Sequence, residues 1–509
     1  MKTKNNLFTY LKRYFQYDKF KTGQKEIIED VLKNKDVLGV LPTGSGKSLC
    51  YQLPALMREG TTIVITPLIS LMIDQVRELK IRGIRDVVAL NSFISWRDRQ
   101  DIYTNLSKYK IVYISPELIQ HNLLLNSLKK LHINLFVIDE AHCISQWGHE
   151  FRMDYLRLKD VITHLGNPPI LALTATATKE VQDDILDILH RPQAVRHIFS
   201  VDRPNIIFSV ESLNNEDEKL DRLINVLSRF RVPTLVYFSS RIKCELVVEE
   251  IRKRLPYLRA SFYHGGMDSL DRLTIQQQFM NDQIDVICCT SAFGMGINKQ
   301  NLRQVIHYHF PIDLESYSQE VGRAGRDGLP SLGLVLYNQA DLSLQKHIIH
   351  QRFPERDSIM QLEYFLLQNK RKEYHSLKSN LLTIVRNNEI HLQFLHYHLE
   401  KHGIINNNRI IEDEQCIINF INDILLHINI RHKTKTNKLM DMLQWLQSKS
   451  CLRSYIYNYF DSNYENLVVC CSNCGFSIED WQPIEAKSIA ESAELNWRRK
   501  LSKLLLTGV

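Results

Sequence analysis

Short apolar runs alternate with amphipathic stretches between about residues 20 and 340. The strand-like runs are DVLGVL, TIVITP, IVYISP, LFVIDE, ILALTA, PTLVYF, DVICCT and VIHYHFP. Continuously apolar strands separated by amphipathic helices are typical of parallel sheets that helices cover on both faces. The number of runs suits two such sheets, so we predict an α/β protein with two parallel-sheet lobes.

A charged, asparagine-rich stretch around residues 200–220 interrupts this alternation, and we place the junction between the lobes there. After Asp341 the strand pattern ends, and segments such as IHLQFLHYHLEKHGII have apolar positions at helical spacing. The predicted division is a first lobe (1–205), a second lobe (206–342), a helical insertion that could form a winged-helix-like unit (343–435), a helical cysteine-bearing module (436–480) and a C-terminal basic helix (481–509).

The composition narrows the class of protein only slightly. A chain of 509 residues is too long for one hydrophobic core. A net charge of +7 permits nucleic-acid binding without requiring it. No apolar run approaches the roughly 18 residues that a membrane span needs. The start, MKTKNNLFTYLKRYF, lacks the apolar stretch of a signal peptide. We therefore expect a cytoplasmic protein with no membrane partner.

The segment GVLPTGSGKSLC follows a predicted strand and opens a predicted helix. Gly44 and Gly46 allow the backbone to curl so that successive N–H groups surround an anion. Lys47 adds a positive charge, and Ser48 can ligate Mg²⁺ at the helix N-terminus. The strict phosphate-loop pattern has glycine where this chain has Leu41, but the strand–loop–helix context is right. We predict that the nucleotide contacts Thr43, Gly44, Ser45, Gly46, Lys47 and Ser48.

Two acidic residues end another strand-like run, LFVIDEAH. Beside a phosphate loop, Asp139 is suited to hold the metal ion, and Glu140 is suited to polarise the attacking water. The alternative is a pair of solvated carboxylates that cap a helix.

An aromatic ring, a cation and an amide precede the phosphate loop in YDKFKTGQ. Tyr17 or Lys21 could pack on the face of a purine, and Gln24 could make a two-point contact with the edge of adenine. A helix start with ordinary surface residues would have the same composition, so this segment does not decide the matter alone.

Gln319, Arg323 and Arg326 recur at helical spacing in SYSQEVGRAGRDG. Arginines three residues apart lie on one face of a helix. From there they could stabilise charge on a phosphoryl group transferred across a cleft. Taken alone, a surface arginine pair is usually only solvated.

Together these stretches resemble superfamily 2 helicases and, more narrowly, the RecQ family. The matching segments are FKTGQ, PTGSGKS, TPLISLMIDQV, ISPE, DEAH, CISQWGHEFRMDY, TATAT, VYFSSR, YHGG, AFGMGINK and QEVGRAGRDG, in the family's order. The resemblance covers about residues 8–345 and, less closely, 435–475. It implies two RecA-like lobes that hydrolyse ATP with Mg²⁺.

The resemblance also implies roles for individual residues. Gln24 would recognise adenine, and Lys47 and Ser48 would bind the phosphates and the metal. Hydrolysis would use the acidic pair with His142 of DEAH, and Gln319 at the shared cleft, with Arg323 and Arg326 as arginine fingers. Lys21 departs from the family, which commonly has arginine there. Because lysine stacks poorly on a base, nucleotide affinity or base selectivity could be lower.

The segment QWGHEFRMDY, directly after the acidic pair, is the family-specific part of the resemblance. Bases of a single strand stack on aromatic rings at about 1–3 kcal/mol each, with little sequence preference. A loop that binds a strand and continues from the metal-holding acids could report DNA occupancy to the ATP site. The alternative is that Trp147 and Phe151 are buried between the lobes. The coupling candidates are Trp147, His149, Phe151 and Arg152.

Other loops of this superfamily contact the sugar–phosphate backbone. In this chain they correspond to TPLIS, SPE, YFSSR and TSAFGMG. Such contacts do not read sequence. We therefore expect any specificity to be for strand type or junction shape.

The ten cysteines fall into two groups. Grouped thiolates in the cytosol, two of them at the spacing of a metal knuckle, favour Zn²⁺. The family usually has a further cysteine where this chain has Ser477, so either Cys470 is the fourth ligand or the site is incomplete. The alternative is four reduced cysteines in a packed helical hairpin. The predicted zinc ligands are Cys451, Cys470, Cys471 and Cys474; the predicted small buried residues are Cys50, Cys143, Cys244, Cys288, Cys289 and Cys416.

The resulting hypothesis is an ATP-dependent DNA helicase that moves 3′ to 5′ on single-stranded DNA and unwinds duplex DNA in repair or recombination. Polarity and pathway come only from the resemblance. Since fewer than roughly 30 residues follow Asp480, the family's two usual downstream domains are not both expected, as in short bacterial RecS-like members. The expected partners are single-stranded DNA, DNA junctions and a single-strand-binding protein, and we expect a nucleoid-associated monomer. The alternatives are an RNA-remodelling ATPase of the same superfamily and an ATP-gated DNA-clamping or annealing module.

Overall fold

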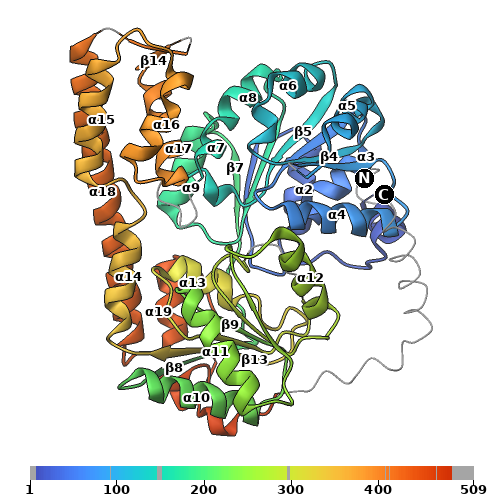
Figure 1. Cartoon of the computed structure of the whole chain (residues 1–509). Coiled ribbons are helices and arrows are strands. Elements are labelled where there is room, and N and C mark those ends of the chain that lie inside the picture. Colours follow the sequence, from blue (N-terminus) through green and yellow to red (C-terminus); the bar gives the residue numbers. More distant parts are fainter. Residues whose placement is uncertain are drawn as a thin grey trace. The chain divides into compact units, whose positions relative to one another are not determined.

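The computed structural model describes residues 7–91, 93–145, 152–294, 299–406, 408–411, 413–465 and 467–483. These residues form two compact units. One comprises the described parts of 1–338 and 445–509, and the other comprises those of 339–444. The first unit contains two parallel sheets with helices against their faces (Figure 1). The predicted α/β fold with two parallel-sheet lobes is confirmed.

The sheet of the first lobe has seven strands among the described residues, in the order β3-β4-β2-β5-β6-β1-β7. All of its strand pairs are parallel. The strands are β1 Val37–Val40, β2 Thr61–Ile65, β3 Val87–Leu90, β4 Ile111–Ile114, β5 Ile133–Ile138, β6 Ile170–Thr174 and β7 Val195–Ile198. The helices are α2 Gln24–Leu32, α3 Leu49–Met57, α4 Ile69–Ile81, α5 Trp96–Thr104, α6 Asn122–Leu128, α7 Met153–Leu156, α8 Leu158–His164 and α9 Lys179–Ile188.

The sheet of the second lobe has six strands among the described residues, in the order β10-β11-β9-β12-β13-β8, and it is also parallel throughout. Its strands are β8 Ile206–Ser212, β9 Thr234–Tyr237, β10 Ala260–Tyr263, β11 Val286–Cys289, β12 Gln304–His307 and β13 Ser331–Tyr337. Its helices are α10 Glu216–Arg229, α11 Arg241–Arg254, α12 Ser269–Met280 and α13 Leu314–Val321.

All eight strand-like runs of the sequence contain a strand, but the pattern missed β3, β7, β8, β10 and β13. The positions of β7 alternate between half-buried and exposed, so it lacks the continuous apolar run of a central strand. Strand β8 lies inside the polar stretch that the sequence predicts to be the junction, and it pairs with β13 at the edge of the sheet. Edge strands tolerate polar residues because one side of the strand is not paired within the sheet.

The second unit is mainly helical, as predicted. Its elements are α14 Asp341–His350, α15 Arg356–Gln368, α16 Tyr374–Ile384, α17 Glu389–Lys401, the hairpin strands β14 Ile405–Asn406 and β15 Arg409–Ile410, and α18 Glu414–Leu446. The predicted division at 435/436 falls within α18. An isolated antiparallel bridge joins Glu373 to Arg409, so a short extended segment between α15 and α16 pairs with the hairpin.

The cysteine-bearing segment packs on the second lobe. It contains α19 Leu452–Tyr459 and the short 3-10 helices η5 Ser472–Cys474 and η6 Ile478–Asp480. The backbone N–H of Phe208 donates to the Cys470 carbonyl at 3.2 Å, which extends the edge of the sheet beyond β8. Trp481 is buried against Phe230, with ring centroids 5.0 Å apart.

One prediction about the scattered cysteines is wrong. Five of the six are buried, but Cys416 is exposed in the first turn of α18. Its thiol donates to Asp413 at 3.3 Å. A helix start on the surface can accommodate a cysteine as readily as a core can, and the local sequence does not separate the two cases.

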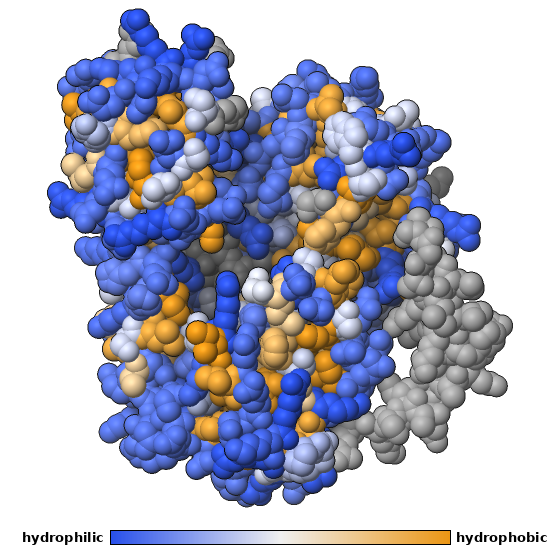
Figure 2. All heavy atoms as spheres, viewed as in Figure 1, coloured by the Kyte–Doolittle hydropathy of each residue, from blue (hydrophilic) through white to orange (hydrophobic). Residues whose placement is uncertain are grey.

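The visible face of the molecule is mainly hydrophilic, with apolar side chains in separate groups (Figure 2). Among the described residues, no helix combines the length and the apolar character needed to cross a bilayer.

Candidate active site and nucleic-acid interface

The predicted phosphate loop connects β1 to α3, with Ser48 as the N-cap residue of α3. Gly44 and Gly46 have φ values of +81° and +75°, which favour glycine. A Cβ atom at Gly46 would lie 2.8 Å from the amide nitrogen of Gln24, so a side chain there would also collide. The loop therefore has the backbone curvature that the sequence predicted.

The side chains of Gln24 and Lys21 hold this loop. The amide of Gln24 donates to the carbonyls of Ser45 and Gly46 at 2.8 and 3.0 Å, and its oxygen accepts from the Lys21 N–H at 2.9 Å. The Lys21 ammonium donates to the Gly44 carbonyl at 2.8 Å. Burial lowers the pKa of Lys21, and the charges of Arg203 and Arg326 lower it further. Their side chains bind the carbonyls of the phosphate loop, and the predicted contacts of both residues with a base remain a prediction.

The acidic pair follows β5. The Asp139 carboxylate accepts from the Glu140 N–H at 3.0 Å, and Glu140 adopts a left-handed conformation with φ +51°. Burial and the neighbouring Glu140 raise the pKa of Asp139 to about 7, while Lys47 opposes the shift. A half-buried acid pair beside a lysine is an environment in which a divalent cation would stabilise both carboxylates.

His142 joins this acidic segment to the next strand. It is fully buried, and its Nδ1 lies 3.0 Å from the Thr174 hydroxyl and 3.5 Å from a Glu140 carboxylate oxygen. Thr174 is the last residue of β6 and begins the TATAT segment. His142 therefore contacts Glu140 and the end of a neighbouring strand at the same time.

The predicted helical placement of both arginines is wrong. Helix α13 ends at Val321, and residues 322–327 form turns in which Gly325 has φ +57°. Gln319 lies in the helix, whereas Arg323 and Arg326 lie on the turns. The spacing of the arginines could not reveal the end of the helix, because remote residues hold these turns. For example, the Asn205 amide donates to the carbonyls of Gly325 and Leu329.

The same cleft contains most of the predicted residues from both lobes, whereas Gln24, Ser45 and His142 are not in its lining. It has a volume of about 360 Å³. Burial, and after it the charges of Arg323 and Arg203, lower the pKa of Arg326 to about 9. The predicted residues that line the cleft are Tyr17, Lys21, Thr43, Gly44, Gly46, Lys47, Ser48, Asp139, Glu140, Gln319, Arg323 and Arg326.

The sequence reasoning missed several cleft residues. Arg82, near the end of α4, lies over the Tyr17 ring at 5.6 Å from its centroid and belongs to the lining, as do Gln75 and Glu78. A planar cation and an aromatic ring side by side offer a surface on which a purine could stack. No local motif marks these positions, because they meet only through the packing of α4 against the N-terminal segment.

Trp147, His149 and Phe151 lie outside the described residues, but both ends of their loop are described. Arg152 donates to the Pro67 carbonyl at 3.3 Å, and its N–H donates to the Cys143 carbonyl at 3.0 Å. Tyr155, in α7, is fully buried, and its hydroxyl donates to the Asp139 carbonyl at 3.2 Å. The residues that follow the loop therefore contact Asp139, through Tyr155, and the TPLIS segment, through Arg152.

A second pocket, of about 410 Å³, lies between loops of the two lobes. It brings together four segments that the sequence matched separately, TPLIS, YFSSR, YHGG and TSAFGMG. Two arginines and several hydroxyl groups suit contacts with phosphate oxygens. The lining residues are Leu68, Arg152, Ser239, Arg241, Gly265, Thr290, Ser291 and Ala292.

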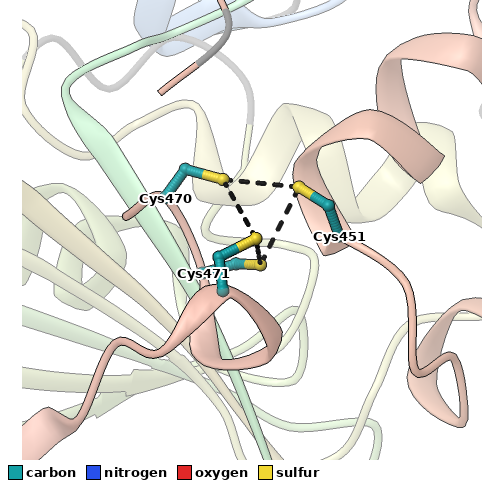
Figure 3. Close-up of side chains that lie close together, drawn as sticks. Cys451, Cys470 and Cys471 are labelled. Carbon is teal, nitrogen blue, oxygen red and sulfur yellow. Dashed lines mark hydrogen bonds between the residues drawn. The ribbon is translucent and has the colours of Figure 1, made fainter. Parts of the chain in front are cut away.

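The four clustered cysteines meet at one point, where the labelled side chains of Figure 3 face one another. The sulfur–sulfur distances are 3.4 Å (451–470), 3.9 Å (470–474), 4.0 Å (451–471) and 3.5 Å (471–474). A tetrahedron of thiolates around zinc has edges of roughly 3.8 Å, given Zn–S bonds of about 2.3 Å. The four cysteines therefore fit a zinc ion.

Ser477 does not join this cluster. Its hydroxyl accepts from the Glu479 N–H at 3.3 Å and donates to the Glu479 carboxylate at 2.7 Å. Cys470 takes the fourth position instead. Burial disfavours the Cys451 thiolate, but hydrogen bonds from Ser454, Cys470 and Cys474 lower the pKa of Cys451 to about 7.

Three family comparisons match consecutive parts of the chain. The DEAD/DEAH box helicase family matches residues 21–184, the helicase conserved C-terminal domain matches 218–328, and the RecQ zinc-binding family matches 405–475.

Named relatives and a solved structure are also similar to this chain. The chain is 41% identical, over 92% of both chains, to the probable ATP-dependent DNA helicase RecS of Bacillus subtilis (strain 168). It is 42% identical to the ATP-dependent DNA helicase RecQ of Haemophilus influenzae, over 68% of this chain and 56% of that protein. The fold is similar to that of the Mycobacterium smegmatis helicase Lhr bound to ssDNA and AMP-PNP, with 17% identity, a TM-score of 0.54, and coverage of 77% of this chain and 56% of that chain.

Proposed function

The chain belongs to the RecQ family of superfamily 2 helicases, and we propose that it is a DNA helicase driven by ATP hydrolysis. One observation carries this proposal. Lys47 and the acidic pair of the first lobe share a cleft with Arg323 and Arg326 of the second lobe. A protein that only bound DNA would not need residues suited to ATP hydrolysis that are contributed by both lobes.

The cleft suits a nucleoside triphosphate because its cations repel one another. Burial first, and the charges of neighbouring arginines second, lower the pKa values of Arg326 and Lys21, and an anionic ligand would stabilise the charged form of both. Lys47 and the loop N–H groups would bind the phosphates. Arg323 and Arg326, on the turns of residues 322–327, would stabilise charge on the transferred phosphoryl group. Ser48 and Asp139 would hold Mg²⁺, which neutralises phosphate charge when bound. Glu140 would orient the attacking water and accept its proton.

The pocket between the lobes supports the proposed path of single-stranded DNA. Its hydroxyl groups, together with Arg152 and Arg241, would contact phosphates without reading sequence. The loop with Trp147, His149 and Phe151 would stack on bases and act on Asp139 through its anchored ends. We propose that DNA binding stimulates hydrolysis by this route.

The second unit is proposed to be the winged-helix-like part of the insertion. Its order of α15, an extended segment at Glu373, α16, α17 and a β-hairpin is that of a helix-turn-helix followed by a wing. A groove of about 1390 Å³ adjoins the turn between α16 and α17. Among its charged lining residues, the three cations Arg356, Arg386 and Lys433 outnumber the single acid Glu355. This charge favours contact with DNA phosphates.

The remaining parts of the proposal follow from family membership and the cysteine geometry. The four cysteines would bind a structural zinc ion. The enzyme would move 3′ to 5′ on single-stranded DNA and act on junctions in repair or recombination, with a single-strand-binding protein as a partner. We propose that it works as a monomer in the bacterial cytoplasm, at the nucleoid.

Steady-state ATP hydrolysis with and without a strand tests the proposal. We expect strong stimulation by single-stranded DNA, and we expect Trp147→Ala to remove most of it while hydrolysis without DNA persists. Equal stimulation of both proteins would contradict the coupling role and assign Trp147 to packing. Stimulation by RNA but not DNA would favour the RNA-remodelling alternative. Strand binding without any hydrolysis would favour an ATP-gated clamp.

A further inference from the structure

Arg203 belongs to the connection between the lobes, and it contacts both the phosphate loop of the first lobe and the turns of the second lobe that carry Arg323 and Arg326. Its guanidinium donates to the Thr43 carbonyl at 3.1 Å and to the Gly322 carbonyl at 2.8 Å. The other terminal nitrogen donates to the carbonyls of Ala324 and Gly325 at 2.9 and 2.6 Å. The planar guanidinium group of Arg203 therefore joins the phosphate loop to the turns that carry Arg323 and Arg326.

Arg203 is not among the described residues that line the nucleotide cleft. Its guanidinium hydrogen bonds are to main-chain carbonyls of the phosphate loop and of the turns, and not to the side chains proposed to act on ATP. A second bond in the same place, from the Thr43 hydroxyl to the Gly322 carbonyl at 3.0 Å, shows how closely the two lobes approach. The hydrogen bonds of Arg203 can therefore affect hydrolysis by positioning the phosphate loop and the turns that carry Arg323 and Arg326.

The position of Arg203 is set in turn by α19. The Tyr457 hydroxyl accepts from the Arg203 N–H at 3.2 Å. The guanidinium of Arg453, one turn earlier in α19, is 1% exposed, forms an ion pair with Asp202, and donates to the carbonyls of Pro204 and Ile206. A buried ion pair with additional carbonyl acceptors fixes geometry because breaking it leaves a charge buried.

The cysteine cluster fixes the start of this helix. Cys451 is the N-cap residue of α19, and the Leu452 N–H donates to the Cys471 sulfur at 3.3 Å. The chain of contacts runs from the cysteines through Arg453 and Tyr457 to Arg203, and from Arg203 to both sides of the ATP cleft.

We propose that Arg203 is a positioning residue for ATP hydrolysis, and that the cysteine-bearing module sets lobe alignment at the ATP site through Arg453 and Tyr457. The module is then a working part of the ATPase. This inference rests on the proposed hydrolysis of ATP and adds a residue and a route to it.

The test compares DNA-stimulated hydrolysis by the full-length protein with that of Arg203→Gln, Arg203→Lys and Arg453→Met. Small displacements of catalytic groups can cost about 100-fold. We therefore expect Arg203→Gln to lower kcat about 10- to 100-fold. The KM for ATP should change by less than about 3-fold, because the arginine turns act mainly in the transition state. Arg203→Lys keeps the charge but not the planar set of N–H donors, so its kcat should be little higher than that of Arg203→Gln. Arg453→Met should lower kcat in the same way while the protein retains its bound metal.

Arg222→Gln is the matched control. Arg222 also ties the module to the second lobe, through Glu211 at 2.6 Å and Glu479 at 3.0 Å, but it does not contact the connection. We expect a lower Tm with an unchanged kcat. If Arg203→Gln does not fold, Tyr457→Phe, which removes only the hydroxyl that accepts from the Arg203 N–H, should lower kcat several-fold.

Unchanged kcat in folded Arg203 variants would overturn the inference, as would an equal loss of kcat in Arg222→Gln. The absence of any hydrolysis by the unmodified protein, with either nucleic acid, would instead overturn the proposed function itself.

Discussion

The hydroxyl of Tyr155 donates to the main-chain carbonyl of Asp139 across 3.2 Å, from a fully buried position. Tyr155 lies four residues after Phe151, so it ties the far end of the aromatic loop to the residue proposed to hold Mg²⁺. Burial, as the largest cause, raises the pKa of Tyr155 well above its ordinary value, so the hydroxyl remains a donor throughout the working pH range.

Tyr155→Phe should reduce the stimulation of ATP hydrolysis by DNA several-fold and leave hydrolysis without DNA close to that of the unmodified protein. The reason is that only the hydroxyl is lost, at a net stability cost of about 1 kcal/mol. Parallel rate measurements over a DNA titration would show the change. Tyr103→Phe, in α5 of the same lobe, is the control, and an equal effect there would remove the special role of Tyr155.

Glu140→Gln should lower kcat by about 10²- to 10⁴-fold, because the amide cannot accept a proton from the attacking water. ATP affinity should stay within a few-fold, since the phosphate loop is intact. Fluorescent-nucleotide binding and single-turnover hydrolysis would separate the two quantities. Hydrolysis at a normal rate would show that another group activates the water.

Cys470→Ala should release the bound metal or lower its stoichiometry, whereas Ser477→Ala should leave one zinc per chain. The four sulfurs lie at distances suited to a tetrahedral site, and the Ser477 hydroxyl is bound to Glu479 instead. Metal analysis of purified proteins, with Tm measured beside it, checks this pair of variants. Retention of zinc by Cys470→Ala would point to a three-cysteine site.

Acidic pH should destabilise the second unit through His398. Burial, followed by the charges of His427 and Lys401, lowers the pKa of His398 to about 3 in the folded protein. Between pH 6.5 and 3 the unfolded chain therefore binds a proton that the folded chain does not, so stability falls as pH falls. The slope from this residue is at most about 1.4 kcal/mol per pH unit.

Hydrogen exchange of α17 amides at pH 7.5, 6.5 and 5.5, corrected for intrinsic rates, would measure this loss. His398→Leu should flatten the dependence, and exposed His164→Gln, in the first lobe, should not. A pH-independent α17 in the unmodified protein would show that His398 is protonated in the folded state.

Arg356→Gln and Lys433→Gln should weaken DNA binding by the full-length protein equally across sequences. Each lost phosphate contact should reduce the slope of log affinity against log salt by about 1. Lys346→Gln is the control, because Lys346 lies on α14 but outside the groove lining. Unaltered affinity and slope would show that the groove does not bind DNA.

The sequence by itself determined the parts of this protein that depend on neighbouring residues. The phosphate loop, the strand that ends at Asp139 and the continuously apolar central strands follow from local spacing, because glycine freedom and side-chain periodicity act over a few residues. The fold class and the phosphate-loop and acidic residues of the cleft followed from these segments, whereas Gln75, Glu78 and Arg82 did not. Edge strands such as β8 escaped the same reasoning, since their polar positions carry no continuous apolar run.

Only the tertiary structure decided how remote segments meet. It placed Arg323 and Arg326 on turns, exposed Cys416, and completed the cysteine cluster with Cys470 in place of Ser477. It also brought Arg203 to Thr43 and Gly322, which are 160 and 119 residues away along the chain. The acceptors in these contacts are main-chain carbonyls, which every residue has. A sequence pattern cannot identify such partners, because their chemistry is common to all positions and only folding brings particular ones within reach.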